Sequence, residues 1–184
     1  MLLIWTFLAG LGLLALVLLT GQAQLASHRN RCRQAWAGVD AQLRRHSELA
    51  GTIAATVEPH AGATDRPTLQ RLADAREALE HSSGVRARCQ SQRVLAGCLQ
   101  DVLDLRNRHA ALAVNIDLAR QMQERAGVVA ATAAAQRQYN EAAEQYDRML
   151  KTLPASLVAR MVGLKPQVRC SFDDKDLATG GGGG

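Results

Sequence analysis

The chain has 184 residues and a formal net charge of +5, and aromatic side chains make up only 3% of it. Ala, Leu, Gln, Arg and Glu are abundant and runs of β-branched residues are scarce, a composition that favours helices over sheet. The arginines are scattered and are not interleaved with aromatic residues, so the positive charge does not indicate a nucleic-acid interface. We therefore expect an all-α protein, with one compact domain after an apolar start.

The first feature in chain order is an apolar stretch without charge over residues 2–19. As a helix it covers roughly 27 Å, close to the hydrocarbon thickness of roughly 30 Å, and Trp5 lies near one edge, where aromatic rings are favoured. Gly21 and Ala23 also suit a signal-peptide cleavage site, but secretory signals carry basic residues that are missing before this stretch. We expect an uncleaved transmembrane anchor over residues 1–24, a helical domain over 25–172 and a disordered tail over 173–184 that ends in polyglycine.

The charges on the two sides of the anchor are asymmetric. No Lys or Arg precedes it, whereas one acid, Asp40, accompanies the arginines that follow it. These are Arg29, Arg31, Arg33, Arg44 and Arg45. The positive-inside rule then predicts a single-pass protein of the bacterial inner membrane, with its N-terminus outside and its helical domain in the cytoplasm. The same arginines are candidates for contacts with anionic lipid headgroups.

Four cysteines lie outside the anchor: Cys32, Cys89, Cys98 and Cys170. No pair has C-x-x-C spacing and no histidine stands beside them at zinc-ligand spacing, so we expect no metal site. In a cytoplasmic domain the thiols are expected to be reduced. Cys32 falls on an apolar seam, where a buried thiol is usually an inert packing residue.

Apolar residues that alternate at spacings of four and three predict a long amphipathic helix over residues 32–57 and another over 118–153, the second ending at Pro154. Two shorter helices are expected between them, one capped near its start by Asp65 and ending at about residue 80, the other starting at Val85 and ending between 106 and 110. No proline separates the anchor from the first long helix, which allows one continuous helix. An antiparallel bundle buries both stripes within one chain, and an extended coiled coil between chains is the alternative.

Residues in two parts of the helical domain, at 34–45 and from 139 onward, match in register a pattern typical of one family of bacterial membrane proteins. They are Trp36, Asp40, Leu43, Tyr139, Asn140, Tyr146, Pro154 and Phe172. On these residues the chain resembles the LemA family. The resemblance implies a single-pass membrane protein with a small helical-bundle domain, in a family with no established enzymatic activity whose members are linked to membrane organisation.

The chain departs from the family pattern at particular positions. Gly51 and Thr52 stand where the family usually has Pro-Asn, and Val129 stands where it often has an acidic residue. The middle of the chain, over residues 62–112, matches only in helical character. The resemblance therefore indicates a divergent member.

Two polar residues beside the seams are candidates for specificity. A polar side chain there can decide which helix faces which, and this is the role expected for Asp40 and Asn140. Asp40 can pair with Arg33 or Arg44 on the same helix, and a solvated ion pair is an equally good account of it.

Three further residues on the seams have structural and functional interpretations. His46 interrupts the apolar seam of the first long helix, and such a residue either hydrogen-bonds a neighbour or acts as a pH-sensitive register device. Tyr139 and Tyr146 lie on the inner stripe of the last helix, where their rings fill core volume and each hydroxyl can bond a polar group on a facing helix. This structural role is favoured over a ligand site.

The sequence contains no nucleophile elbow, paired metal-binding histidines or phosphate-binding loop, so we expect no catalytic activity, cofactor or small-molecule substrate. The predicted function is a membrane-anchored helical scaffold that organises membrane or protein partners. Small residues in the anchor, among them Gly10 and Gly12, favour self-association into a homo-oligomer. The alternative is an accessory subunit that recruits a membrane enzyme such as a protease through the exposed face of the last helix, and nucleic-acid binding is the least favoured.

Overall fold

The computed structural model describes residues 2–152, 156 and 166–170, and it leaves out the side chains of residues 2–4, 6–11 and 13–19. Every regular element within these ranges is a helix, which confirms the all-α prediction. Pro154, Phe172 and the tail expected from residue 173 lie outside the described residues.

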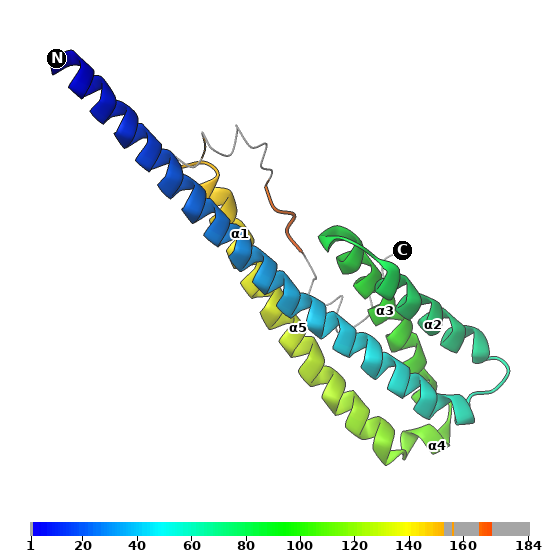
Figure 1. Cartoon of the computed structure of the whole chain (residues 1–184). Coiled ribbons are helices and arrows are strands. Elements are labelled where there is room, and N and C mark those ends of the chain that lie inside the picture. The colour runs from blue at the N-terminus through cyan, green and yellow to red at the C-terminus, as the bar shows by residue number, and fades with distance from the viewer. Residues whose placement is uncertain (1, 153–155, 157–165, 171–184) are drawn as a thin grey trace.

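The longest element, α1 (Leu2–Val57), is one helix that runs from the expected anchor through the first amphipathic stripe. Its 56 residues span about 84 Å at 1.5 Å per residue. The N-terminal part of α1 extends beyond the other helices (Figure 1), and the Trp5 side chain there is 72% exposed. Among the side chains that the structure describes, no helical stretch is both long and apolar enough to cross a membrane. The anchor predicted over residues 2–19 falls largely on side chains outside that description.

The second long helix, α5 (Ile116–Met149), runs antiparallel to α1 and packs along it (Figure 1). The predicted stripes form this contact: Leu43 and Ile53 of α1 and Tyr139 of α5 are buried at the interface side of their helices. The stripes therefore face each other within one chain, as the bundle prediction requires. Helix α5 ends at Met149, a few residues before the predicted end at Pro154, because the chain turns at residues 150–151.

A shorter helical hairpin, α2 (Arg66–His81) and α3 (Val85–Asp104), packs at the end of the bundle that is remote from the N-terminus. Gly84 precedes α3 with a φ of +83°, a left-handed conformation that glycine adopts without strain and that produces the predicted break. A short 3-10 helix (Leu105–Asn107) and α4 (Ala110–Ala113) connect α3 to α5. Leu72, Leu95 and Leu99 of the hairpin join Ile53 of α1 in the largest hydrophobic cluster.

Asp65 stands at the N-cap of α2, but its side chain makes no cap hydrogen bond there. Its buried carboxylate instead accepts a hydrogen bond from His109 Nε2 at 2.7 Å and one from the N–H of Gly62 at 3.1 Å. These hydrogen bonds, that of His109 first, hold the pKa of Asp65 below its usual value. Instead of capping α2, the Asp65 side chain thus links the α1–α2 loop to the segment that leads into α4.

Candidate functional site: the C-terminal strap and its clamp

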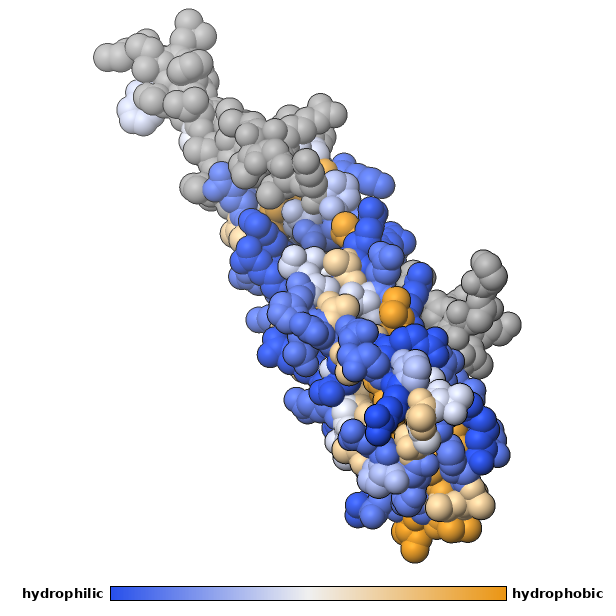
Figure 2. All heavy atoms as spheres, turned by 90° about the vertical axis from the view of Figure 1, so that its right-hand side faces the viewer, coloured by the Kyte–Doolittle hydropathy of each residue, from blue (hydrophilic) through white to orange (hydrophobic). Residues whose placement is uncertain are grey.

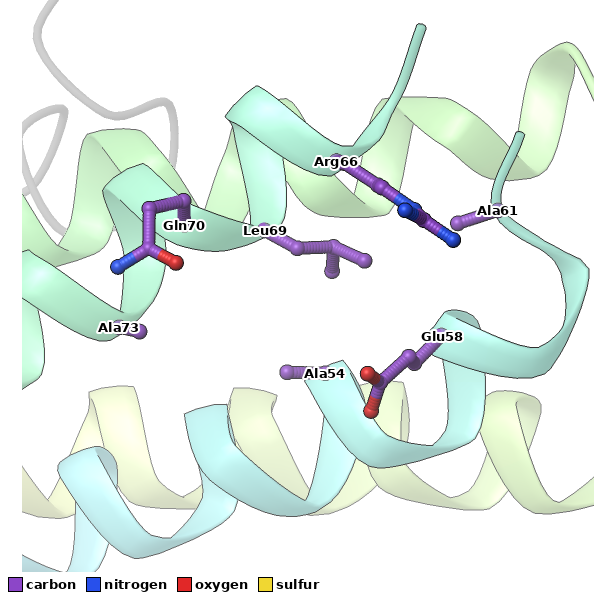
Figure 3. A pocket seen from close by; sticks show the side chains of 7 residues that line it. All are labelled: Ala54, Glu58, Ala61, Arg66, Leu69, Gln70 and Ala73. Atoms are coloured by element: carbon purple, nitrogen blue, oxygen red, sulfur yellow. The ribbon is translucent and has the colours of Figure 1, made fainter. Parts of the chain in front are cut away.

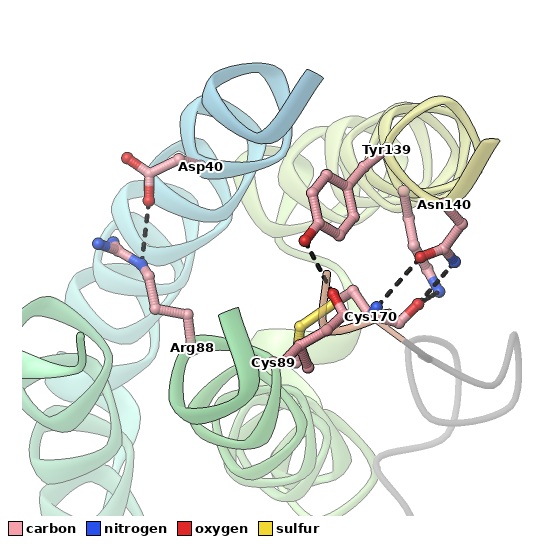
Figure 4. Close-up of a disulfide and its surroundings, with 8 residues drawn as sticks. Asp40, Arg88, Cys89, Tyr139, Asn140 and Cys170 are labelled. Carbon is pink, nitrogen blue, oxygen red and sulfur yellow. Dashed lines mark hydrogen bonds and ion pairs between the residues drawn. A yellow bond between two sulfur atoms is a disulfide. The ribbon is translucent and has the colours of Figure 1, made fainter. Parts of the chain in front are cut away.

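Residues 166–170 have no regular secondary structure and lie against α5 and α3, and we call them the C-terminal strap (Figure 4). Four side chains on α5 hold the backbone of the strap, and we call them the clamp. The clamp consists of Gln136, Tyr139, Asn140 and Asp147. Near the N-terminal end of the strap, Asp147 Oδ1 accepts a hydrogen bond from the N–H of Gln167 at 3.0 Å. The spacings of three, four and seven residues place the clamp on one face of the helix.

Asn140 makes the most specific contact with the strap. Its Oδ1 accepts the N–H of Cys170 at 3.1 Å, and its Nδ2 donates to the Cys170 carbonyl at 2.7 Å. Gln136 Nε2 donates to the same carbonyl at 3.0 Å. The Asn140 amide therefore satisfies both backbone polar groups of one residue, as a neighbouring strand would. Asn140 was expected to decide which helix faces which, whereas its side chain hydrogen-bonds the strap.

Tyr139 connects the strap to α1. Its hydroxyl donates to the Val168 carbonyl at 2.8 Å, and its ring packs edge to face against Trp36, with ring centroids 5.3 Å apart. Leu43 belongs to the same hydrophobic cluster, whereas Tyr146 packs nearer the N-terminus with Leu25. The two sequence motifs at opposite ends of the domain thus meet at Trp36 and Tyr139, and the Tyr139 hydroxyl bonds the strap instead of a facing helix.

A disulfide joins Cys170 of the strap to Cys89 of α3, across a sequence separation of 81 residues (Figure 4). The expectation of reduced thiols is therefore wrong for this pair, although Cys32 and Cys98 are free. Burial raises the pKa of the Cys32 thiol, in agreement with its expected packing role. The spacing of Cys89 and Cys170 matches no short motif, because the fold alone brings the two positions together.

Asp40 joins α1 to α3 beside the disulfide. It pairs with Arg44 at 2.6 Å, which confirms one of the two predicted partners, and its second oxygen lies 3.0 Å from Arg88 Nε (Figure 4). Arg88 precedes Cys89, so this ion pair fixes the turn of α3 that carries the disulfide. The pairing of Asp40 with Arg88 was not predicted, because it depends on the packing of α3 on α1.

The arginines expected to contact lipid or set the topology do not form one group. All have exposed side chains: Arg29, Arg31, Arg33, Arg44 and Arg45. Arg44 and Arg45 are engaged with acids of the bundle, Arg45 at 3.2 Å from Glu124 of α5. Arg29, Arg31 and Arg33 therefore lie near the predicted anchor, whereas Arg44 and Arg45 form ion pairs within the bundle.

Gly51, one of the departures from the family pattern, lies beneath a side chain of α2. A Cβ at this position would come within 2.7 Å of the Arg76 guanidinium. Arg76 Nε donates to the Ser47 carbonyl of α1 at 2.9 Å. The absence of a side chain at Gly51 thus lets α2 bond the backbone of α1.

A buried polar pair lies in the seam between α1 and α3. His46 is 1% exposed, and its Nδ1 accepts a hydrogen bond from Gln92 Nε2 at 2.6 Å. Burial and, to a smaller extent, the charge of Arg125 on α5 lower the pKa of His46, the Gln92 contact opposes the shift, and the resulting pKa is about 4. The imidazole is therefore neutral at neutral pH and hydrogen-bonds a neighbour, the first of its two interpretations.

This pKa predicts a pH dependence of stability. A pKa that is lower in the folded than in the unfolded chain stabilises the fold above the unfolded value of 6.5, and this contribution is lost as the pH falls toward 4. At 1.36 kcal/mol per pKa unit the loss is about 3 kcal/mol at pH 4. Urea unfolding of the wild type and of His46→Gln at pH 7 and pH 4 measures it: the wild type should lose about 3 kcal/mol more. Equal losses in the two proteins would show that His46 does not carry the effect.

A hollow of about 500 Å³ lies between the end of α1 and the start of α2 (Figure 3). Glu58 and Arg66 extend into it at one end and Leu69 projects into its middle. Its lining consists of Ala54, Glu58, Ala61, Arg66, Leu69, Gln70 and Ala73. These residues include no Ser, Thr, Cys or His, so the lining offers no side-chain nucleophile of those types.

A model of the LemA family matches residues 35–179, most of the chain. The match includes the clamp on α5 and the strap, and it also runs through residues 62–112, where the sequence resembled the family only in helical character. No curated protein matches the chain.

Proposed function

The chain belongs to the LemA family, and on that premise we propose that it is a membrane-anchored helical scaffold without enzymatic activity. Residues 2–19 would form the anchor, and the bundle would present surfaces to other copies of the chain or to membrane proteins. The proposed location is the bacterial inner membrane, crossed once.

The observation that carries this proposal is the continuity of α1. One helix contains both the apolar stretch and the stripe that packs on α5. From residue 20 to Val57 it extends over about 55 Å at 1.5 Å per residue. A helix without a hinge would hold the bundle at a set distance and orientation from the membrane, as a scaffold requires.

The end of the bundle remote from the N-terminus supplies a surface for a partner. Val114 is 78% exposed and Ile116 is 83% exposed, and Figure 2 shows hydrophobic side chains gathered at one tip of the molecule. Exposed apolar side chains of this size are typical of contact sites when they cluster. The tip supports partner binding in either candidate role, that of scaffold or that of accessory subunit.

We predict that deleting residues 2–19 releases the chain from the membrane. The deletion removes the apolar stretch whose burial in lipid would hold the protein. Fractionation with an alkaline carbonate wash should find the full chain in the membrane pellet and the deletion variant in the supernatant. A control variant in which residues 2–19 are all leucine should stay in the pellet. If copies of the full chain can be crosslinked to each other and copies of this leucine variant cannot, self-association depends on the small residues of the anchor. A deletion variant that remains in the washed pellet would contradict the anchor.

Crosslinking from the exposed tip, on the membrane-bound protein, separates the two functional candidates. A photo-crosslinker at Val114 that joins copies of the chain, or several different membrane proteins, supports the scaffold. A single enzyme recovered in stoichiometric amount would favour the accessory subunit instead.

A further inference from the structure

We propose that the Cys89–Cys170 disulfide is a permanent structural crosslink introduced by a disulfide-bearing oxidoreductase, and that the helical domain lies on the oxidising side of the membrane. This is the side opposite to the one that the arginine count predicts. The assignment to a side rests on the proposed anchor, whereas the crosslink does not.

The geometry selects this pair among the four cysteines. The Cα atoms of Cys89 and Cys170 are 6.4 Å apart, within the range that disulfides require. Helix α3 fixes Cys89, and Asn140 and Gln136 fix the backbone of Cys170 through both its N–H and its carbonyl. Each partner is thus held in place by contacts that do not involve its sulfur.

Burial indicates a structural disulfide and not a catalytic or regulatory one. Cys170 is 1% exposed and Cys89 is 7% exposed, and both belong to the hydrophobic cluster around Tyr139. Disulfides that form transiently in the cytosol act in catalysis or redox sensing and must be reached by their partners. A buried crosslink is typical of proteins that fold outside the cytosol.

The charge signal for a cytoplasmic domain becomes weaker when the structure is considered. Arginines count toward topology mainly within about 15–20 residues of a membrane span, and long domains cross largely regardless of charge. Counted from the end of the apolar stretch at residue 19, Arg44 and Arg45 lie beyond that distance, and they pair with Asp40 and Glu124. Only Arg29, Arg31 and Arg33 then oppose an outward domain.

The covalent step balances by thiol–disulfide exchange. The thiolate of one cysteine attacks the disulfide of the oxidoreductase and forms a mixed disulfide, releasing one thiol of the enzyme. The second thiolate then attacks the chain's own sulfur in that bond and releases the other thiol. The two thiols of the chain lose two protons and two electrons, and the disulfide of the enzyme becomes a dithiol.

Thiol counting in cells tests the crosslink. Cells that make the full chain are quenched in acid, and the denatured protein is treated with a maleimide that adds a fixed mass to each free thiol. We expect two tags on the wild type before reduction, on Cys32 and Cys98, and four after it. Cys170→Ala should carry three tags in both cases, and Cys98→Ala, the matched control, should carry one before reduction and three after. Four tags on the unreduced wild type would overturn the proposal.

A second labelling experiment tests the side of the membrane independently of the disulfide. In Cys98→Ala, an added Val114→Cys at the exposed tip should react with a membrane-impermeant maleimide on intact spheroplasts, and Leu2→Cys should react only after lysis. The reverse pattern would place the domain in the cytoplasm and overturn the orientation. If the full chain is found outside the membrane pellet, the proposed anchor is wrong. The thiol count still tests whether the Cys89–Cys170 crosslink forms.

Discussion

Replacing both Cys89 and Cys170 by alanine is expected to lower the free energy of unfolding by about 4 kcal/mol, since a crosslink that closes a loop of this length removes much of the entropy of the unfolded chain. The sequence separation of 81 residues makes this loop nearly half the chain. The strap would then depend on its hydrogen bonds to α5 alone. Urea unfolding of the oxidised full chain in detergent, followed by circular dichroism, measures the change.

Two comparisons identify the cause of that loss. Reduction of the wild type by dithiothreitol should destabilise it by a similar amount, because the same crosslink is opened. Cys98→Ala, which alters a free and half-buried thiol, should change the free energy of unfolding by no more than about 1 kcal/mol. A double variant as stable as the oxidised wild type would show that the crosslink does not stabilise the bundle.

Tyr139→Ala is expected to cost about 4 kcal/mol, as truncation of a buried aromatic residue typically does. The ring is 1% exposed, packs against Trp36 and lies in the cluster that contains the disulfide. Its removal leaves a cavity between α1 and α5 and also deletes the hydrogen bond to the Val168 carbonyl. The measurement is urea unfolding of the oxidised protein.

Tyr139→Phe is the matched control, because it keeps the ring and removes only the hydroxyl. We expect it to cost about 1 kcal/mol, the usual contribution of one hydrogen bond. It should also make the strap easier to cleave with protease while α1 and α5 stay protected. If Tyr139→Phe were as destabilising as Tyr139→Ala, the hydroxyl contact would dominate and the packing argument would be wrong.

Much of the helical framework could be predicted from local patterns. The alternating spacing around Leu43 and Ile53 identified the buried stripe of α1, and Gly84 identified the break between α2 and α3. These features depend on side-chain periodicity and backbone preference over short distances, which the sequence shows directly. The family could also be identified from short patterns, because the aromatic residues could be matched to the family pattern one by one.

The candidate site could be predicted only in part. Tyr139 and Asn140 were identified as important, but their bonds to a strap that comes some thirty residues later in the chain could not be inferred from helix spacing. The pairing of Asp40 with Arg44 follows from a spacing of four, whereas its pairing with Arg88 needs α3 to pack on α1.

The sequence by itself determined an all-α chain of the LemA family with two long amphipathic stripes, because residues a few positions apart decide helix formation and the burial of one helical face. Only the tertiary structure decided that Cys89 meets Cys170 and that one face of α5 holds the strap. Contacts between residues that are far apart in sequence depend on how whole helices pack, and a pattern over a few neighbouring residues does not encode that packing.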